Sequence, residues 1–260
     1  MVIVNYRGIA SDDPYLGIVG VRDIVRPFTP VVLGESETIP GKQGEYDYGF
    51  TFGPKVISCR ILVGGSTLAE LRQFARRIAS WLQWPEVSPL TFSDETGIQY
   101  QARLNKAVDA QQIVNTGQAT IEFRIPEGVA EATSTKSVSG SPASVSYEGT
   151  AEAPMIVTCT MQEQSDTLKL HFGDPGGTHL LLQKDVANWD FVMEVNDVVE
   201  FNTANHMVKL NGVDARAGLA LSSDWRNFKL PRSMNPPTVV EINAVPASTS
   251  LEVVLRERWV

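Results

Sequence analysis

One helical pattern interrupts a chain whose other periodic segments indicate strands, and it limits the folds available. Thr67 and Glu70 have the spacing of a capping box, in which two side chains satisfy backbone donors at a helix start. Pro85 ends the pattern because proline has no N–H to donate and restricts the preceding residue. Apolar residues recur between them at a spacing of three and four: Leu68, Leu71, Phe74, Ala75, Ile78, Trp81 and Leu82. The sequence therefore predicts a helix from Leu68 to about Gln83, with one face packed on a sheet.

Strand patterns surround this helix on both sides. An apolar run over residues 56–63 precedes it, and residues 90–92 and 98–104 follow it as a hairpin around a polar turn that ends in Gly97. Residues 119–124 alternate between apolar and polar, as a half-buried strand does. These patterns predict a β-rich α+β domain with one helix.

Glycines and aromatic residues alternate just before the first of these strands. Tyr46, Tyr48, Phe50 and Phe52 are interleaved with small or polar residues, which predicts a hairpin that carries an aromatic face. A phosphate-binding loop is excluded, because Lys42 is followed by Gln43 and not by serine or threonine. We expect Tyr46, Tyr48 and Phe50 to face a neighbouring subunit.

The composition changes over residues 126–142, which are rich in small and hydroxyl residues and poor in large apolar ones. Such a segment is typical of a linker. The predicted domains are therefore residues 1–130 and 144–260, joined by a linker at 131–143. Short strands and turns such as Asn211–Gly212 fill the second domain, and they predict a β-sandwich of jelly-roll or lectin type. The predicted fold class is thus mainly β.

The net charge of -8 bears on the partners. Lys plus Arg against Asp plus Glu is 12 against 14 in residues 1–130 and 10 against 16 in residues 131–260. Since an acidic surface repels phosphates, specific nucleic-acid binding is not expected. The first residues lack a signal peptide's basic start and apolar core, and no apolar run approaches the ~18 residues of a membrane span. We expect synthesis in a cytoplasm and no membrane contact.

The residues offer little support for catalysis. Asp94 and Glu95 are adjacent carboxylates, yet charged residues in a turn are ordinarily solvated and point apart. The motifs of serine hydrolases and of dinucleotide-binding proteins are missing from the sequence. His171, Asp174 and His179 flank one turn, but three such residues without a helical pair are a weak metal signal. The prediction is a protein that is not an enzyme, with no catalytic residue, cofactor or metal site.

Cysteine and tryptophan residues suggest further roles. Cys59 and Cys159 lie in apolar strand patterns of different domains, where free cysteine behaves as a small buried hydrophobe. Trp225 follows a polar loop sequence, and exposed indoles are surfaces on which sugar rings stack. It is the candidate for an alternative function, a carbohydrate-binding module that recognises cell-wall sugars.

Several stretches resemble the distal tail proteins of siphophages. In the first half these are Ile39-Pro40-Gly41-Lys42-x-Gly44, the helix with Trp81-Leu82, and Pro89-Leu90-Thr91-Phe92-Ser93-Asp94-Glu95 with Tyr100-x-Ala102-Arg103-Leu104. In the second half they are Gly149-Thr150-Ala151-Glu152-Ala153-Pro154, Val208-Lys209-Leu210-Asn211-Gly212 and the ending Leu251-Glu252-Val253-Val254-Leu255-Arg256-Glu257-Arg258-Trp259.

The resemblance implies a structural virion protein at the phage tail tip, made in the bacterial host cytoplasm. It implies a homo-hexameric ring built by the first domain, and a galectin-like or carbohydrate-module-like second domain. The ring would join the tail tube protein to the tail-tip protein of the host-adsorption device, with a central passage for the tape measure protein and DNA.

Overall fold

The computed structural model describes residues 2–108, 110–113, 116–173, 176–184, 192–233 and 237–260. The chain divides into two compact units, Met1–Thr133 with Val260, and Ser134–Trp259. We describe each unit by itself. The chain is mainly β, with one α-helix among the described residues, as the sequence predicts.

The first unit is built on a long antiparallel sheet with the strand order β2-β1-β7-β8-β10-β6-β3. β9 pairs with the end of β10, and β11 pairs with β8. The strands are β1 (Val4–Tyr6), β2 (Ile9–Ala10), β3 (Ile18–Val25), β6 (Lys55–Gly64), β7 (Ser88–Phe92), β8 (Ile98–Leu104), β9 (Ala110–Ile113), β10 (Thr116–Ile125) and β11 (Ala130–Ala132). Alternate residues of β6 are buried, which is the pattern of a strand with one face on a core.

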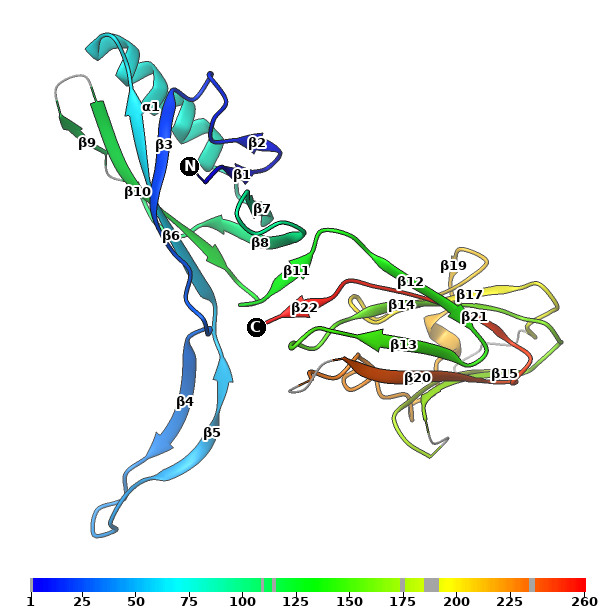
Figure 1. The fold of residues 1–260 in the computed structure, drawn as a ribbon. Coiled ribbons are helices and arrows are strands. Elements are labelled where there is room, and N and C mark those ends of the chain that lie inside the picture. Colours follow the sequence, from blue (N-terminus) through cyan, green and yellow to red (C-terminus); the bar gives the residue numbers. More distant parts are fainter. Residues whose placement is uncertain (1, 109, 114–115, 174–175, 185–191, 234–236) are drawn as a thin grey trace. The chain divides into compact units, whose positions relative to one another are not determined.

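Helix α1 (Leu68–Leu82) lies along the buried side of this sheet (Figure 1). The Thr67 hydroxyl accepts the Glu70 backbone N–H at 3.2 Å, as a capping residue does. The Glu70 carboxylate accepts the Ser66 backbone N–H at 2.7 Å, one residue earlier than in the standard capping box. The predicted helix is confirmed at both ends.

Three of the four buried residues of the helix lie in its second half. Leu71, Ile78, Trp81 and Leu82 are buried, whereas Ala75 is exposed and Phe74 is half-buried. The Trp81 indole N–H donates to the Tyr6 carbonyl at 3.1 Å, and the two rings meet edge to face. This hydrogen bond ties the helix to the first strand of the sheet.

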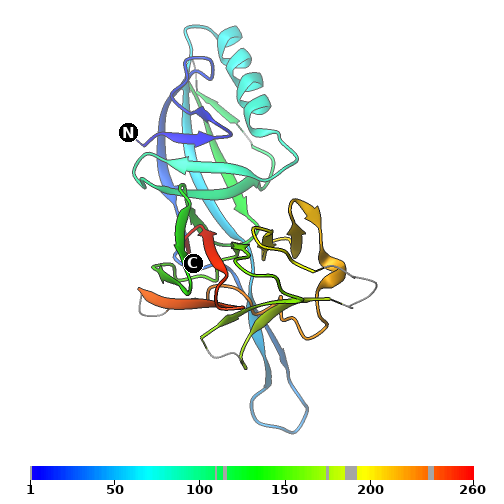
Figure 2. The same ribbon diagram turned by 90° about the vertical axis from the view of Figure 1, so that its right-hand side faces the viewer.

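A separate two-stranded sheet leaves the first unit between β3 and β6. It consists of β4 (Val32–Glu37) and β5 (Tyr46–Phe52), and Figures 1 and 2 show it extending away from the long sheet as a ribbon. Every residue of both strands is exposed. We call residues 31–53, which contain β4, β5 and the residues that join them, the hairpin.

The second unit is a β-sandwich, in agreement with the predicted architecture. One sheet has the order β12-β21-β14-β17-β18-β19 and the other the order β13-β20-β15-β16. The elements are β12 (Lys136–Gly140), β13 (Ala143–Tyr147), β14 (Met155–Thr160), β15 (Thr167–Phe172), β16 (His179–Gln183), β17 (Val198–Asn202), β18 (Met207–Leu210), β19 (Val213–Asp214), the 3-10 turn η1 (Arg216–Gly218), β20 (Thr238–Val245), β21 (Ser250–Leu255) and β22 (Arg258–Trp259). One continuous apolar core joins residues of both sheets.

The expected linker at 131–143 contains strands. The division between the units falls at Thr133 and Ser134, but β12 follows at once and pairs with β21 along its whole length. Val138 packs on the sandwich core, and Lys136 donates to the Ser146 carbonyl at 2.6 Å. Serine and threonine suit an edge strand as well as a loop, so composition alone did not distinguish the two.

A close contact explains why glycine stands at position 149. The buried Tyr147 hydroxyl donates to the Ala151 carbonyl at 2.5 Å and accepts the Arg258 backbone N–H at 3.3 Å. A Cβ atom on Gly149 would collide with this hydroxyl and with the Arg258 carbonyl. The absent side chain of Gly149 therefore leaves the space in which the last strand docks.

We expect Gly149→Ala to destabilise the second unit by roughly 1–3 kcal/mol, the usual range for overpacking. Chemical unfolding followed by intrinsic fluorescence measures the change. Gly34→Ala is the matched control, since no atom lies within 4 Å of the added methyl group. Equal stability of the two variants would contradict the packing explanation.

Candidate subunit interface

The hairpin exposes large apolar side chains on both of its faces. Ladder partners lie on one face of a sheet, and Val32 is opposite Phe52 while Gly34 is opposite Phe50. The two phenylalanine rings therefore share a face with Val32, and they contact each other edge to face with centroids 5.4 Å apart.

The tyrosines lie on the opposite face. The register shifts between Gly34 and Ser36, so that Tyr46 is opposite Glu37. The Tyr48 hydroxyl donates to the Glu37 carboxylate at 3.2 Å. Gly49, at a φ of 96°, accommodates the β-bulge that causes the shift. The expected single aromatic face is thus wrong, because the alternation is interrupted by one extra residue.

Exposure of this kind is unusual for aromatic side chains. Tyr48 is 66% exposed and Phe50 is 62% exposed, and Leu33 on the tyrosine face is 51% exposed. A two-stranded hairpin is marginally stable in water when no layer covers it. The hairpin therefore carries the apolar side chains of a strand pair that is covered by another surface.

The hairpin is also acidic. Residues 31–53 contain Glu35, Glu37, Glu45 and Asp47 against Lys42, so their net charge is 1 − 4 = −3. Within the described part of the chain none of these four carboxylates forms an ion pair; Glu45 and Glu37 accept hydroxyl groups of the hairpin itself. Lys42 lies over the Tyr46 ring.

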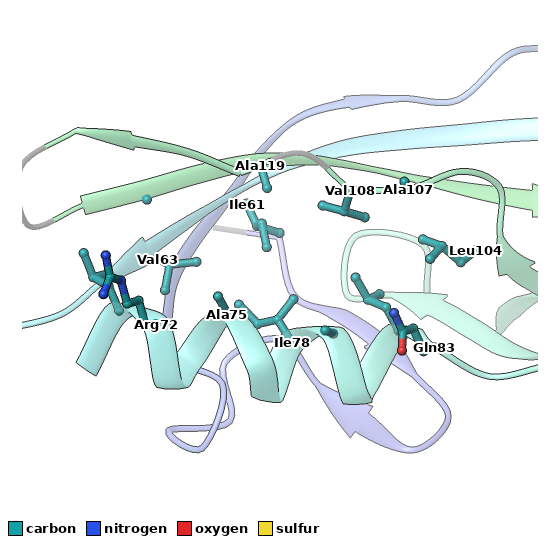
Figure 3. Close-up of a pocket in the computed structure, with 14 residues that line it drawn as sticks. Ile61, Val63, Arg72, Ala75, Ile78, Gln83, Leu104, Ala107, Val108 and Ala119 are labelled. Atoms are coloured by element: carbon teal, nitrogen blue, oxygen red, sulfur yellow. The ribbon is translucent and has the colours of Figure 1, made fainter. Parts of the chain in front are cut away.

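An apolar groove of about 380 Å³ lies beside α1 in the same unit (Figure 3). Ile61 and Val63 of β6 lie across it from Ala75 and Ile78 of the helix. It exists because small residues meet there: Ala75 and Ala79 from the helix, and Ala107, Gly117 and Ala119 from the sheet side. Arg72 and Gln83 stand toward its two ends.

The outer side of α1 is basic. Arg72 and Arg76 are exposed, and neither forms an ion pair with any residue that the structure describes. Arg77 is partly used within the unit, because it donates to the Tyr15 carbonyl at 3.1 Å and lies over the Tyr15 ring. With Glu70 the helix has a net charge of 3 − 1 = +2, opposite in sign to the hairpin.

The carboxylates Asp94 and Glu95 have structural partners. The Arg26 guanidinium forms a two-point contact with Asp94, at 2.6 and 3.0 Å, and lies over the Phe92 ring. Glu95 accepts the Tyr100 hydroxyl at 2.9 Å. The hydrogen bond from Arg26 lowers the pKa of Asp94, so this carboxyl is held in its charged form. Asp94 and Glu95 thus hold the turn between β7 and β8 in place.

The contribution of this ion pair depends on pH. Because the folded-state pKa of Asp94 is depressed, its stabilisation is full above the unfolded pKa of about 3.9 and is lost as pH falls through the folded pKa. Asp94→Asn should cost at most about 1 kcal/mol at pH 7, since the pair is partly exposed. Urea unfolding at pH 7 and at pH 3 measures it; a difference from wild type that did not shrink at the lower pH would contradict the linkage.

Trp225 is half-buried in the second unit. One side of the indole packs on the sandwich core, with its ring 6.5 Å from that of Phe201, and His206 lies 5.5 Å away. Asp224 shapes the loop by accepting the Asn227 backbone N–H at 3.2 Å. Core packing accounts for part of the indole surface, and sugar stacking on the remainder stays a prediction.

The cysteines and the metal-ligand candidates of the sequence form no site among the described residues. Cys59 and Cys159 are buried and free, and burial raises the pKa of the Cys59 thiol to about 12. Asp174 lies outside the described residues, and among those described no three metal-ligating side chains come together. In the same ranges no helix is long and apolar enough to cross a membrane.

Comparison with known proteins places both units in one family. The phage tail protein RIFT-related domain matches residues 14–125, and the siphovirus-type tail component C-terminal domain matches residues 148–259. The chain belongs to the distal tail protein family of siphophages. The two matches together span most of the sequence, and they agree with the resemblance drawn from the sequence motifs. No sequence among curated proteins matches the chain.

Solved structures show the same fold. The Dit protein of phage SPP1, described as a paradigm of the hub adsorption apparatus of phages that infect Gram-positive bacteria, is 17% identical, with full coverage of both chains and a TM-score of 0.80. A chain of the phage P2 baseplate, in its activated conformation with Ca, is 9% identical over 99% of this chain and 98% of that one, with a TM-score of 0.50. With the two family matches, this distal tail protein is a structural component of the phage tail.

The sequence predicted part of the candidate interface of this distal tail protein. The hairpin with Tyr46, Tyr48 and Phe50 was found from its alternation, and all three side chains are exposed. The groove was missed, because Ala75 fits the apolar spacing of the helix as well as a core residue does. The small residues of three separate elements around one hollow were the only available signal, and no periodicity reveals it.

Proposed function

We propose that this distal tail protein forms a homo-hexameric ring in which the first unit builds the ring and the hairpin residues Tyr46, Tyr48 and Phe50 lie at the contact between subunits. The ring joins the tail tube protein to the tail-tip protein of the host-adsorption device. Its centre is the passage for the tape measure protein and then the DNA. The chain is made in the host cytoplasm and becomes part of the virion.

One observation carries the proposal: large apolar side chains are exposed on both faces of the hairpin, and none of the described residues of its own unit forms a layer on either face. Aromatic residues are enriched in the buried centres of protein interfaces. The likeness in fold to a hub protein of the adsorption apparatus supports the same role. The family's structural role agrees with a protein that acts by assembly and not by catalysis.

The molar mass of the purified chain tests the ring. Light scattering across a concentration series should show a species of six chains, and negative-stain images of the same fractions should show closed rings. Adding the tail tube and tail-tip proteins should favour that species. A monomer at every concentration, alone and with both partners, would overturn the proposal.

A further inference from the structure

A surface complementary to the hairpin is apolar, hollow and positively charged. Its phenylalanine face presents two rings in edge-to-face contact, and four carboxylates lie along the same ribbon. Two parts of the first unit carry exposed arginines, most of them without an ion pair among the described residues, and the two parts differ in shape. Their shape and their charge decide which one fits the hairpin.

The first is the outward face of the long sheet. Arg22 is opposite Arg60 on β3 and β6, and Arg103 is opposite Arg124 on β8 and β10. Like charges placed directly opposite each other destabilise a strand pair, so this face attracts acidic groups of a partner. Its arginines do not line the groove beside α1, and Arg60 already pairs with Asp23 at 2.9 Å.

The second is the groove beside α1. It has apolar walls, a volume of about 380 Å³, and the exposed Arg72 at its rim. Interfaces combine such an apolar centre with a charged rim whose sign is complementary to that of the partner. The groove therefore meets both requirements, the apolar hollow and the positive charge.

We infer that the α1 groove of one copy receives the Phe50–Phe52 face of the hairpin of a second copy, with Arg72 and Arg76 beside the hairpin carboxylates. This inference rests on the proposed ring and names the two surfaces that meet in it. The donor and the acceptor are different surfaces of one unit, so the contact is heterologous. Repetition of a heterologous contact closes into a ring when the rotation allows it.

A mixing experiment tests the pairing. A chain with Phe50→Ser and Phe52→Ser keeps its groove, and a chain with Ala75→Glu keeps its hairpin. Each alone should have the molar mass of a monomer, because every contact in a ring needs both surfaces. Mixed in equal amounts, they should form a two-chain species and no ring, since only one intact pair of surfaces is available.

Matched controls separate the groove from general effects of charge or folding. Gln73→Glu adds the same charge on an exposed position of the same helix, outside the groove, and should assemble as wild type does. Phe28→Ser removes a ring that is 96% exposed but lies outside the hairpin, and should also assemble. Circular dichroism checks that Ala75→Glu folds; if it does not, Ala79→Gln replaces it.

A cross-link gives a second measurement that does not depend on tight association. Chains with Phe50→Cys and chains with Ala75→Cys, mixed with a short bismaleimide, should give a cross-linked dimer at a yield at least tenfold above a Phe28→Cys and Ala75→Cys mixture. The native cysteines do not interfere, because both are buried.

The outcomes distinguish this inference from the proposed ring. If wild type and Ala75→Glu both form rings, the ring stands and the groove assignment is overturned. If Arg124→Glu abolishes assembly and Ala75→Glu does not, the acceptor is the outward sheet face. If wild type never forms rings, the proposed function fails, and equal cross-linking in the two mixtures then overturns the inference as well.

Discussion

Replacing residues 33–52 by a two-glycine turn is expected to leave both units folded and to abolish self-association. The hairpin contributes nothing to either apolar core, so its loss removes no packing within the unit. The Gly53 N–H donates to the Val31 carbonyl at 2.6 Å, which places the two ends of the deletion close enough for a short turn. The interface loses its aromatic centre, where binding energy concentrates.

Sedimentation velocity and thermal unfolding of the shortened chain make the measurement. The expected result is a monomer whose unfolding transitions match those of wild type under conditions where wild type is dissociated. A shortened chain that still forms six-chain species would contradict the role of the hairpin. Unfolding at lower temperature would show instead that the hairpin stabilises its own unit.

The second large effect is expected from Trp81→Ala, at about 3–5 kcal/mol of the first unit's stability. The indole is 3% exposed, and its removal leaves a cavity between α1 and β1. It also leaves the buried Tyr6 carbonyl without the indole N–H that it accepts. Both losses weaken the attachment of the helix to the sheet.

Denaturant unfolding should show this loss in the first unit while the second unit keeps its midpoint. Trp84→Ala is the matched control, because Trp84 is exposed and the Arg7 guanidinium lies over its ring, 4.0 Å from the centroid. We expect less than about 1 kcal/mol for that change. Similar losses for the two variants would mean that Trp81 does not carry the helix contact.

Elements fixed by local chemistry were predicted well. The helix has a capping threonine, a clear apolar spacing and a terminating proline, and its bounds agree with the prediction to within a residue. β6 and the turn after β7 were found in the same way. Each of these signals lies within one element or at its ends, where one side chain directly restricts its neighbours.

Features that depend on distant residues were not predicted. The bulge at Gly49 changes which face Phe50 occupies, and alternation alone cannot show one extra residue. β12 looked like a linker because its partner β21 lies more than a hundred residues later. The groove required Ala75 and Gly117 to meet in space, which only the tertiary structure brings about.

The way the hairpin joins its unit has a mechanical consequence. Only Gly53 and Pro54 separate β5 from β6, and β6 lies between β10 and β3 with ten residues in register with β10. A pull along the hairpin therefore acts along the axis of β6. The ladder hydrogen bonds then bear the load in shear, all at once, and they resist it far better than bonds that open one after another. Force applied at the hairpin is passed into the ten-residue ladder between β6 and β10.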